Sequence, residues 1–326
     1  MLAVTVNPQV KGSLNLEEVP VPSLEAGEVL VKIKTAALNH RDIYVKNGWS
    51  FLKDIETKLI TGGDGAGVIV ELGSEVTGWN VGDEVMLNPY DMENDKFLGG
   101  PVDGTFAEYV KISSNAILRK PEYLTFEESA AIPLALSTAW GTVVTQGKIK
   151  EGETVLLQGV GGGVALFILQ LALEKGAKVI VTSGSDEKIQ RAIEMGAVAG
   201  FNYKTQNIAE KVLEFTAGRG VDVVVDSSGK ESIDSSIQSL AKNGRLLVFG
   251  STTGGIDWEK LQAEEYFVET EMVNQQDLEA AIHYYSERQL HPILSQKVYR
   301  LEEYKEAYQE LEEAKQFGKI VLRVEK

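Results

Sequence analysis

The pattern of apolar residues changes about a third of the way along the chain. Up to about residue 120, short alternating or β-branched runs are separated by turn residues, which is typical of antiparallel strands. Beyond Thr125, which with Glu128 forms a helix-start signal, apolar runs of strand length alternate with helical patterns. The strands expected in the first part are Leu2–Val6, Glu28–Ala37, Gly67–Leu72, Glu84–Leu87 and Phe106–Ile112.

The alternation in the second part predicts an open, doubly wound parallel sheet with helices on both faces. Its expected strands are Thr154–Gln158, Lys178–Thr182, Ala199–Asn202, Val221–Asp226 and Arg245–Phe249, and the helices between them are Asp186–Met195, Gln206–Ala217 and Ser232–Lys242. Two helices follow, Gln276–Arg288 and Leu301–Lys315. Gly318 ends the second, and Lys319–Val324 forms a closing strand.

A glycine cluster lies between the first of these strands and a helix expected over Leu166–Lys175. The common G-x-G-x-x-G pattern fails there, because the sixth position from Gly159 is Val164; instead a small residue recurs at Gly159, Gly162 and Ala165. Strand, glycine turn and helix are the setting in which bare backbone amides hold a pyrophosphate. We therefore predict a dinucleotide site, with a purely structural turn as the alternative. Its turn residues are Gly159, Gly161, Gly162, Gly163 and Val164.

Composition excludes several classes of function. The formal net charge of −16 argues against nucleic acid as a partner, and the absence of cysteine removes disulfides, thiol nucleophiles and cysteine-bound zinc. Residues 155–173 are nearly uncharged, but four glycines, Gln158 and Gln170 favour a buried helix over a membrane span. No secretory signal is visible at Met1–Val6, so a cytoplasmic location is expected.

Several blocks, in order, give the chain its resemblance to a known family. They are Leu38–Asp42, Gly63–Gly67, Gly82-Asp83, Asp103–Tyr109, Ala130–Gly141, the glycine turn, Gly250–Gly254 and Gln316–Val321. With them the chain resembles the medium-chain dehydrogenase/reductase family, in particular its zinc-free, quinone-oxidoreductase-like branch. The resemblance implies an α/β protein with a GroES-like β-barrel domain (1–122), a Rossmann domain (123–267) and a C-terminal segment (268–326) that returns to the first domain. It also implies a homodimer, although the segment 257–272 is shorter than usual.

The positions of the family's zinc ligands differ here. Asn39-His40-Arg41-Asp42 stands where zinc-dependent members carry a cysteine, and Gly63-Asp64 replaces their His-Glu pair. Their four-cysteine loop has no counterpart in Leu87–Gly104. The resemblance therefore implies no metal. His40, Asp42 and Asp64 remain a weaker alternative, because zinc needs three or four converging ligands. His283 and His291 are expected at the surface or in caps.

The end of the second parallel strand distinguishes the two nicotinamide cofactors. A carboxylate there would hydrogen-bond the ribose 2′-hydroxyl, whereas this chain has Ser183-Gly184-Ser185, 24 residues past Gly159. Ser183, Gly184 and Lys188 suit a phosphate, and the resemblance adds Tyr203, so we predict NADPH. In the alternative, Lys188 is solvated and Tyr203 only packs, while Asp186 and Glu187 turn toward the ribose and favour NADH.

Further site residues follow from the resemblance. Thr138, Ser251 and Thr252 match positions that line the nicotinamide and its phosphates, and Phe317, Gly318 and Lys319 match a segment that approaches the cofactor. Gly318 is also explained as a helix cap.

The chemistry follows from the lack of zinc. Without a Lewis acid, hydride transfer to a quinone or an α,β-unsaturated carbonyl is easier than alcohol oxidation. In the matched block, Tyr44 is the candidate proton donor, Asn39 orients substrate or nicotinamide, and Asp42 acts there or caps a turn. Trp49 and Tyr90 form an aromatic substrate wall or belong to the core. The alternatives are an alcohol or aldehyde dehydrogenase, or a catalytically silent NADP-binding sensor or structural protein.

Overall fold

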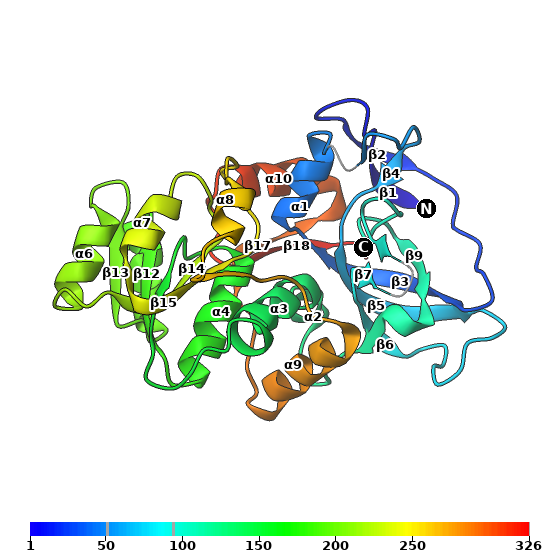
Figure 1. Ribbon diagram of the computed structural model, residues 1–326. Coiled ribbons are helices and arrows are strands. Elements are labelled where there is room, and N and C mark those ends of the chain that lie inside the picture. The colour runs from blue at the N-terminus through cyan, green and yellow to red at the C-terminus, as the bar shows by residue number, and fades with distance from the viewer. Residues whose placement is uncertain (50–51, 93–94, 326) are drawn as a thin grey trace. The chain divides into compact units, whose positions relative to one another are not determined.

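The computed structural model describes residues 1–49, 52–92 and 95–325 and divides the chain into two compact units. The first unit contains residues 1–134 and 274–326, and the second contains residues 135–273 (Figure 1). The divisions fall after Leu134 and Val273, whereas the sequence analysis expects boundaries after residues 122 and 267. Both ends of the chain belong to the first unit, as the resemblance implies.

The second unit is a six-stranded, all-parallel sheet with the order β13-β12-β11-β14-β15-β16. In order along the chain this is 3-2-1-4-5-6, the order of a dinucleotide-binding Rossmann sheet. Val155, Leu156 and Leu157 in the central strand are fully buried, because strands flank them on both edges and helices on both faces. The strands are β11 (Thr154–Leu157), β12 (Lys178–Ser183), β13 (Ala199–Asn202), β14 (Val221–Asp226), β15 (Leu240–Val248) and β16 (Phe267–Glu269), and the helices are α4 (Gly163–Glu174), α5 (Asp186–Glu194), α6 (Ile208–Phe215), α7 (Ile233–Gln238) and α8 (Trp258–Gln262).

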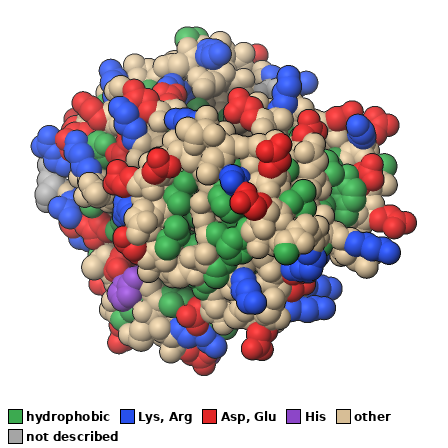
Figure 2. All heavy atoms as spheres, turned by 90° about the vertical axis from the view of Figure 1, so that its left-hand side faces the viewer, with side chains coloured by type: hydrophobic (Ala, Val, Ile, Leu, Met, Phe, Trp, Pro, Cys, Tyr) green, Lys and Arg blue, Asp and Glu red, His purple; other side chains and the backbone are tan. Residues whose placement is uncertain are grey.

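Charged side chains of both signs are interspersed with apolar ones over the described surface drawn in Figure 2. The formal net charge of −16 is therefore not gathered on that face. Among the described residues, no helix is both long and apolar enough to cross a membrane.

The first unit is built on a seven-stranded sheet in which the C-terminal segment lies beside the N-terminal part of the chain. β18 (Lys319–Arg323) pairs antiparallel with β3 (Glu28–Ala37) and parallel with β17 (Leu294–Arg300). The order is β10-β6-β5-β3-β18-β17, and β9 also pairs with β3. The remaining strands are β5 (Asp64–Leu72), β6 (Glu84–Leu87), β9 (Tyr109–Ser113) and β10 (Ile117–Arg119), with a small sheet of β1 (Leu2–Val6), β2 (Leu14–Glu18) and β4 (Leu59–Ile60) and a pair of β7 (Tyr90–Asp91) and β8 (Lys96–Phe97).

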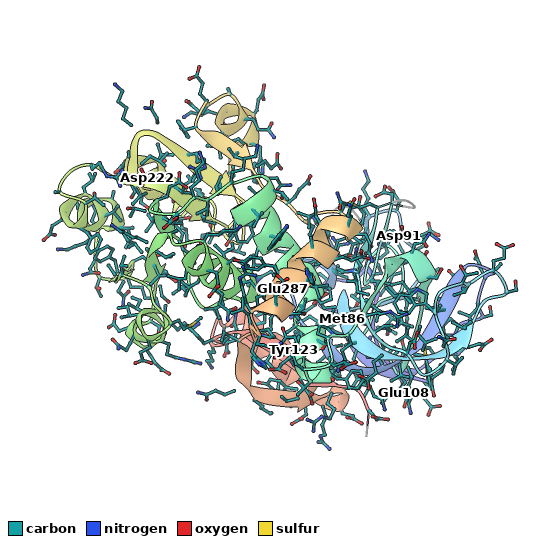
Figure 3. All side chains as sticks on the ribbon, turned by 90° about the horizontal axis from the view of Figure 1, so that it is seen from below. Met86, Asp91, Glu108, Tyr123, Asp222 and Glu287 are labelled. Atoms are coloured by element: carbon teal, nitrogen blue, oxygen red, sulfur yellow. The ribbon has the colours of Figure 1, made fainter. Side chains whose placement is uncertain are left out.

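The small sheet is tied to the chain next to β9 by a hydrogen bond from its backbone to a side chain. The Leu2 N–H donates to Oε2 of Glu108 at 2.8 Å, and Glu108, labelled in Figure 3, directly precedes β9. Phe106, close to Glu108 in sequence, is fully buried, and its ring meets that of Tyr308 in the helix α10 (Tyr304–Glu312) edge-on at 6.2 Å.

The other helices of this unit are α1 (His40–Lys46), α2 (Phe126–Ala130) and α9 (Gln275–Glu287), and α3 (Pro133–Trp140) begins in it. The predicted capping box of Thr125 and Glu128 is confirmed.

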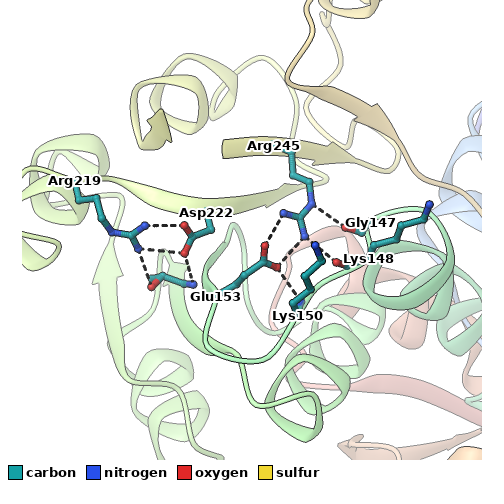
Figure 4. A network of polar contacts seen from close by, with 8 residues as sticks. Gly147, Lys148, Lys150, Glu153, Arg219, Asp222 and Arg245 are labelled. Carbon is teal, nitrogen blue, oxygen red and sulfur yellow. Dashed lines mark hydrogen bonds and ion pairs between the residues drawn. The ribbon is translucent and has the colours of Figure 1, made fainter. Parts of the chain in front are cut away.

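A polar network joins the strands of the second unit at their amino ends (Figure 4). Arg245 donates to both carboxylate oxygens of Glu153 at 2.8 and 2.9 Å and to the carbonyl of Gly147 at 2.8 Å. Asp222 pairs with Arg219 and accepts from the Thr154 N–H at 2.8 Å. The network fixes the entry to β11, at the opposite end of the strands from the glycine turn, and its role is structural.

The predicted elements differ from the observed ones mainly at their ends. The expected helix Leu301–Lys315 is a 3₁₀ turn followed by α10, which stops at Glu312. Gly318 lies beyond the end of this helix, so the prediction that it caps the helix is wrong. A glycine is needed there for another reason, because a Cβ on Gly318 would collide with the carbonyl of Ile293. The strand expected at Arg245–Phe249 begins at Leu240. Elements not predicted, such as α1, α3, β16 and β17, are short or carry no clean period.

Candidate functional site

The glycine turn opens the helix α4, and the residue that caps the helix, Gly162, has no side chain to bond its first amides. Gly159 and Gly161 have φ of 76° and 125°, values that favour glycine. Gly162 caps α4 with φ −75° and ψ 158°, and no side chain bonds the first-turn amides. A Cβ on Gly162 would meet nothing within 4 Å, so the space above this residue is open. Bare amides at the positive end of a helix dipole are the arrangement that favours a bound anion in other proteins.

A buried polar network holds the turn from below. Thr182 accepts from the Gly159 N–H at 3.0 Å and donates to Gln158 Oε1 at 2.7 Å. Gln158 Nε2 donates to Ser236 Oγ at 3.1 Å, and that hydroxyl donates to the carboxylate of Asp226 at 2.6 Å. The turn is thus fixed by β12, β14 and α7 together. Sequence reasoning missed Asp226, for which the available signal was an acid at the carboxyl end of a buried strand.

Three of the residues predicted for the 2′-phosphate, together with Lys204, lie around the end of β12. A Cβ on Gly184 would lie 2.9 Å from the hydroxyl of Tyr203 and 2.7 Å from Cε of Lys204. Ser183 is buried, and its Oγ accepts from the Ser185 N–H at 3.3 Å. Lys204 was missed, although it directly follows Tyr203 in the sequence.

Lys188 reaches back over the glycine turn. Its Nζ lies 3.4 Å from the position of a Cβ on Gly161, so the ammonium group lies between the turn and the end of β12. Asp186, the acid expected to compete for a ribose, accepts instead from Asn202 Nδ2 at 2.7 Å. Two lysines, Lys188 and Lys204, therefore lie near the end of β12, and Asp186 is bonded to Asn202.

The other residues predicted for the cofactor lie in both units. In the second, Thr138 is buried in α3, and Ser251 and Thr252 follow β15 at the same carboxyl edge as the turn. Ser251 Oγ is buried without a hydrogen-bond partner among the described residues, and Thr252 is exposed. In the first unit, Phe317 is buried just before Gly318.

A buried ion pair lies in the first unit at the positions where the resemblance places zinc ligands. Lys319 Nζ donates to Asp64 Oδ2 at 2.8 Å and to Asn39 Oδ1 at 2.6 Å, and the side chains of Lys319 and Asp64 are 3% and 0% exposed. Asn39 Nδ2 donates to Asp64 Oδ2 at 2.9 Å, and the Leu134 N–H donates to Oδ1 at 2.9 Å. The three side chains come from β18, β5 and the cap of α1.

Asp42 closes this cluster on the helix side. Its carboxylate accepts from the Asn39 N–H at 2.8 Å, and burial raises its pKa to about 7. Burial, with the nearby charge of Lys319, lowers the pKa of His40. Among the described residues, no group of three or more His, Asp or Glu side chains is arranged to hold a metal ion. The oxygen atoms of Asn39 and Asp64 that could have faced a metal instead accept from the Lys319 ammonium group.

Aromatic residues gather beside α1. Tyr44 is half-buried, its pKa is raised by burial, and its ring lies 6.2 Å from that of Trp49. Its hydroxyl has no hydrogen-bond partner among the described residues. Tyr90 stacks on Phe97 at 5.5 Å, and the guanidinium of Arg41 lies over the rings of Phe97 and Trp49.

The two remaining histidines lie on the surface, as expected. His283 is paired with Glu287 within α9 at 3.2 Å, and its side chain is largely exposed. His291 contacts Glu128, the capping residue of α2, at 2.6 Å. Neither belongs to the candidate site.

The fold defines a class of protein: an α/β protein with a Rossmann-type parallel sheet and a second, mainly antiparallel β unit. The model of the family described as "Alcohol dehydrogenase GroES-like domain" matches residues 25–122, and that of "Zinc-binding dehydrogenase" matches residues 163–287. A zinc-type alcohol dehydrogenase-like protein of Schizosaccharomyces pombe is 34% identical over 99% of both chains.

Solved structures give the same result. A crystal structure of an NAD-dependent alcohol dehydrogenase aligns over 100% of both chains with a TM-score of 0.90 and 33% identity. The quinone oxidoreductase of Coxiella burnetii aligns over 100% of this chain and 99% of its own, with a TM-score of 0.85 and 28% identity. The chain belongs to the medium-chain dehydrogenase/reductase superfamily and is an oxidoreductase of that family.

Proposed function

We propose that this protein is an NADPH-dependent reductase that delivers hydride, without zinc, to a quinone or another α,β-unsaturated carbonyl compound. The observation that carries the proposal is the arrangement at the end of β12. There Gly184 is faced by Tyr203 and Lys204, Lys188 extends over the adjacent turn, and the nearest acid is occupied by Asn202.

A 2′-phosphate fits this arrangement better than a ribose hydroxyl does. A phosphate carries charge and three acceptor oxygens, which ammonium groups and a phenol hydroxyl satisfy. A site for NADH needs a free carboxylate at the end of the strand, and Asp186 is turned toward Asn202. The pyrophosphate would lie on the bare amides from Gly161 to Val164. Thr138, Ser251, Thr252, Phe317, Gly318 and Lys319 remain proposed contacts of the same cofactor.

The first unit supplies the groups that stabilise the reduced substrate. The cofactor supplies a hydride, and negative charge then develops on the carbonyl oxygen of the acceptor. Tyr44 is the proposed donor to that oxygen, because its hydroxyl is free among the described residues. Asn39 is bonded at both ends of its amide, so we propose that it positions Lys319 and Asp64, with Asp42 fixing its backbone.

Zinc has a poor donor set at the corresponding positions. Zinc prefers Cys, His and carboxylate ligands that converge on an open point, and here a carboxylate and an amide oxygen converge on an ammonium group. A divalent cation would have to displace Lys319 from a buried position. Elemental analysis of protein purified without chelators tests this, and near-stoichiometric zinc would refute the proposal.

The 2′-phosphate site is tested by comparing 2′,5′-ADP with 5′-AMP in binding calorimetry. Wild-type protein should bind the bisphosphate more tightly, and Lys204→Ala and Lys188→Ala should each weaken it by ~1–3 kcal/mol, roughly 5- to 150-fold, with little effect on 5′-AMP. Lys178→Ala is the matched control, an exposed lysine at the other end of β12. Equal losses for the two nucleotides would show that the lysines only support the fold.

Turnover is tested with a panel of quinones and enones at saturating NADPH. Tyr44→Phe should lower kcat by about 10²- to 10⁴-fold without changing NADPH affinity, the range for loss of a proton donor. Tyr109→Phe in β9 is the control. If no electrophile oxidises NADPH above background while the cofactor binds, the protein is a silent NADP-binding sensor.

An alcohol dehydrogenase is the second candidate, favoured by the full-length alignment with the NAD-dependent enzyme of that name. Alcohol-dependent reduction of NAD⁺, with tighter binding of NADH than NADPH, would support it instead.

We also propose a homodimer, because β16 pairs with β15 on one side only within the described sheet. Sedimentation equilibrium measures the oligomeric state directly.

A further inference from the structure

The guanidinium of Arg41 is enclosed by aromatic rings in the first unit. Its Cζ lies 3.7 Å from the ring centroid of Phe97 and 4.8 Å from that of Trp49. Nη2 donates to the carbonyl of Gly100, whereas Nε is buried and has no hydrogen-bond partner among the described residues. A planar cation stacked over two rings, with a donor that has no acceptor, is oriented, but its hydrogen-bonding capacity is not fully used.

Two other stacked arginines show what is missing. Arg119 lies 4.6 Å from the ring centroid of Trp79 and bonds the carbonyl of Gly78, but it also pairs with Asp83 at 3.4 Å. Arg288 lies over Tyr284 and has Glu287 at 3.5 Å. Arg41 has the rings and the carbonyl, yet it forms no ion pair with any described carboxylate.

The acid next to it in sequence does not fill this role. Asp42 is the acid whose charge acts on Arg41, but its carboxylate is directed to the Asn39 N–H and is itself fully buried. Arg41 is only partly exposed, and its buried Nε has no acceptor among the described residues, so a bound ligand could supply one. Tyr44, the proposed proton donor, lies one helical turn from Arg41 and packs against the same Trp49.

We propose that Arg41 is a specificity-determining residue that binds a carboxylate of the substrate, so that the preferred substrates are α,β-unsaturated carbonyl compounds that carry an anionic carboxyl group. This inference rests on the proposed reductase function and names its substrate class. Phe97 and Trp49 hold the guanidinium plane, and the unused Nε and Nη1 donors are available to the carboxylate. A neutral quinone would leave them without a partner.

The reaction of a test substrate balances without a further reactant. In trans-4-oxo-2-pentenoate the hydride of NADPH adds to C2, the carbon that carries the carboxylate. The C2=C3 electron pair moves toward the carbonyl to give an enolate, and a proton is then added at C3. The products are 4-oxopentanoate (levulinate) and NADP⁺, with one proton consumed. The carboxylate is unchanged throughout, so it serves only for recognition.

The kinetic test compares kcat/KM for this acid with that for its methyl ester, because the ratio cancels differences in cofactor binding. Arg41→Met and Arg41→Gln should each lower the acid-to-ester ratio about 10- to 100-fold relative to wild type, the range for a lost charge-assisted hydrogen bond. Arg119→Met is the matched control and should leave the ratio unchanged. A ratio that is the same in wild type and in the folded Arg41 variants would overturn the proposal.

A binding test is independent of turnover and of the variants. Calorimetry with the NADP⁺-loaded protein should show levulinate binding at least ~10-fold more tightly than methyl levulinate, and Arg41→Gln should abolish the difference. Equal binding of the acid and its ester to wild-type protein would overturn the proposal even if no Arg41 variant folds. If no electrophile is reduced but levulinate binds through Arg41, the proposed reductase function fails while the carboxylate site stands.

Discussion

Replacing Lys319 by methionine tests whether the buried ion pair is needed to keep the first unit folded. The substitution removes the ammonium group but keeps an unbranched chain of similar length. Asp64, which is fully buried, would then retain only the donors Asn39 Nδ2 and Leu134 N, both at 2.9 Å. Removal of one partner from a buried pair destabilises by about 3–5 kcal/mol, because the other charge stays desolvated. The two remaining hydrogen bonds place the expected loss near the lower end, about 3 kcal/mol.

A double-mutant cycle separates the lost charge from the lost packing. Asp64→Asn alone leaves a buried ammonium group with neutral oxygens, and a loss of about 3 kcal/mol is expected again. The double variant has no buried charge in the pair, so its loss should be smaller than the sum of the two by about 1–3 kcal/mol. Lys46→Met is the control, because Lys46 pairs with Glu312 in the same unit but both are partly solvated, and a loss below about 1 kcal/mol is expected.

The assay must report on the first unit alone, because a chain with two compact units need not unfold in one transition. Hydrogen exchange measured on peptides from β5 and β18 gives the local free energy of opening, and peptides from β14 serve as the internal reference. The reasoning is refuted if both single variants lose less than about 1 kcal/mol in β5 and β18, or if their losses add in the double variant.

Three further changes test the cofactor turn, the buried acid and the polar network. Gly162→Val should fold normally, because a Cβ there meets nothing within 4 Å, yet lose almost all affinity for NADPH in a calorimetric titration; an unchanged dissociation constant would place the dinucleotide elsewhere. Burial raises the pKa of Asp42 from 3.8 to about 7. Between about pH 4 and pH 7 the folded chain therefore keeps a proton that the unfolded chain has lost, and the free energy of unfolding falls as pH rises. Asp42→Asn should remove this fall, a relative gain of up to ~4 kcal/mol in urea unfolding at pH 8 compared with pH 4; parallel pH profiles would contradict the assignment. Arg245→Met should destabilise the second unit by about 1–3 kcal/mol through loss of its bonds to Glu153, measured by exchange in β15 peptides, and protection equal to wild type would show that the network is dispensable.

The sheet of the second unit was readable from sequence because its signals are local. Buried parallel strands are continuous apolar runs, and each such strand of this sheet except β16 was predicted within a few residues. β16 was missed because its three residues are too few to show a period, and α3 because its apolar run Pro133–Trp140 reads as either helix or strand. The predicted strand Arg245–Phe249 starts five residues later than β15, because Ala241-Lys-Asn-Gly244 carries a turn signal.

The candidate site also contains residues that local sequence signals predict and contacts that they do not. The turn from Gly159 to Gly163 and Ser183, Gly184 and Lys188 lie within two neighbouring strand–helix units, so spacing predicts them together, whereas Tyr203 follows β13 and was added by the family resemblance. The Lys319–Asp64 pair joins residues 255 positions apart, and Lys319 and Asn39 are 280 apart. No local period encodes such contacts, and charge patterning could not pair one lysine with one of 48 acids.

Arg41 shows why contacts rather than residue types decide a site. In the sequence it is one basic residue in Asn39–Asp42, and neither its type nor its spacing distinguishes it from other arginines of the chain, such as Arg119. In the structure Arg41 stacks on two rings and Arg119 on one, each donates to a backbone carbonyl, and of the two only Arg119 also pairs with a described carboxylate. The Arg41 guanidinium is stacked on aromatic rings and donates to a backbone carbonyl, but it has no ion pair with a described carboxylate, so a substrate carboxylate could bind it. The buried Nε of Arg41, without a partner among the described residues beside two stacked rings, therefore supports the proposed recognition of a substrate anion, and the acid-to-ester comparison tests it directly.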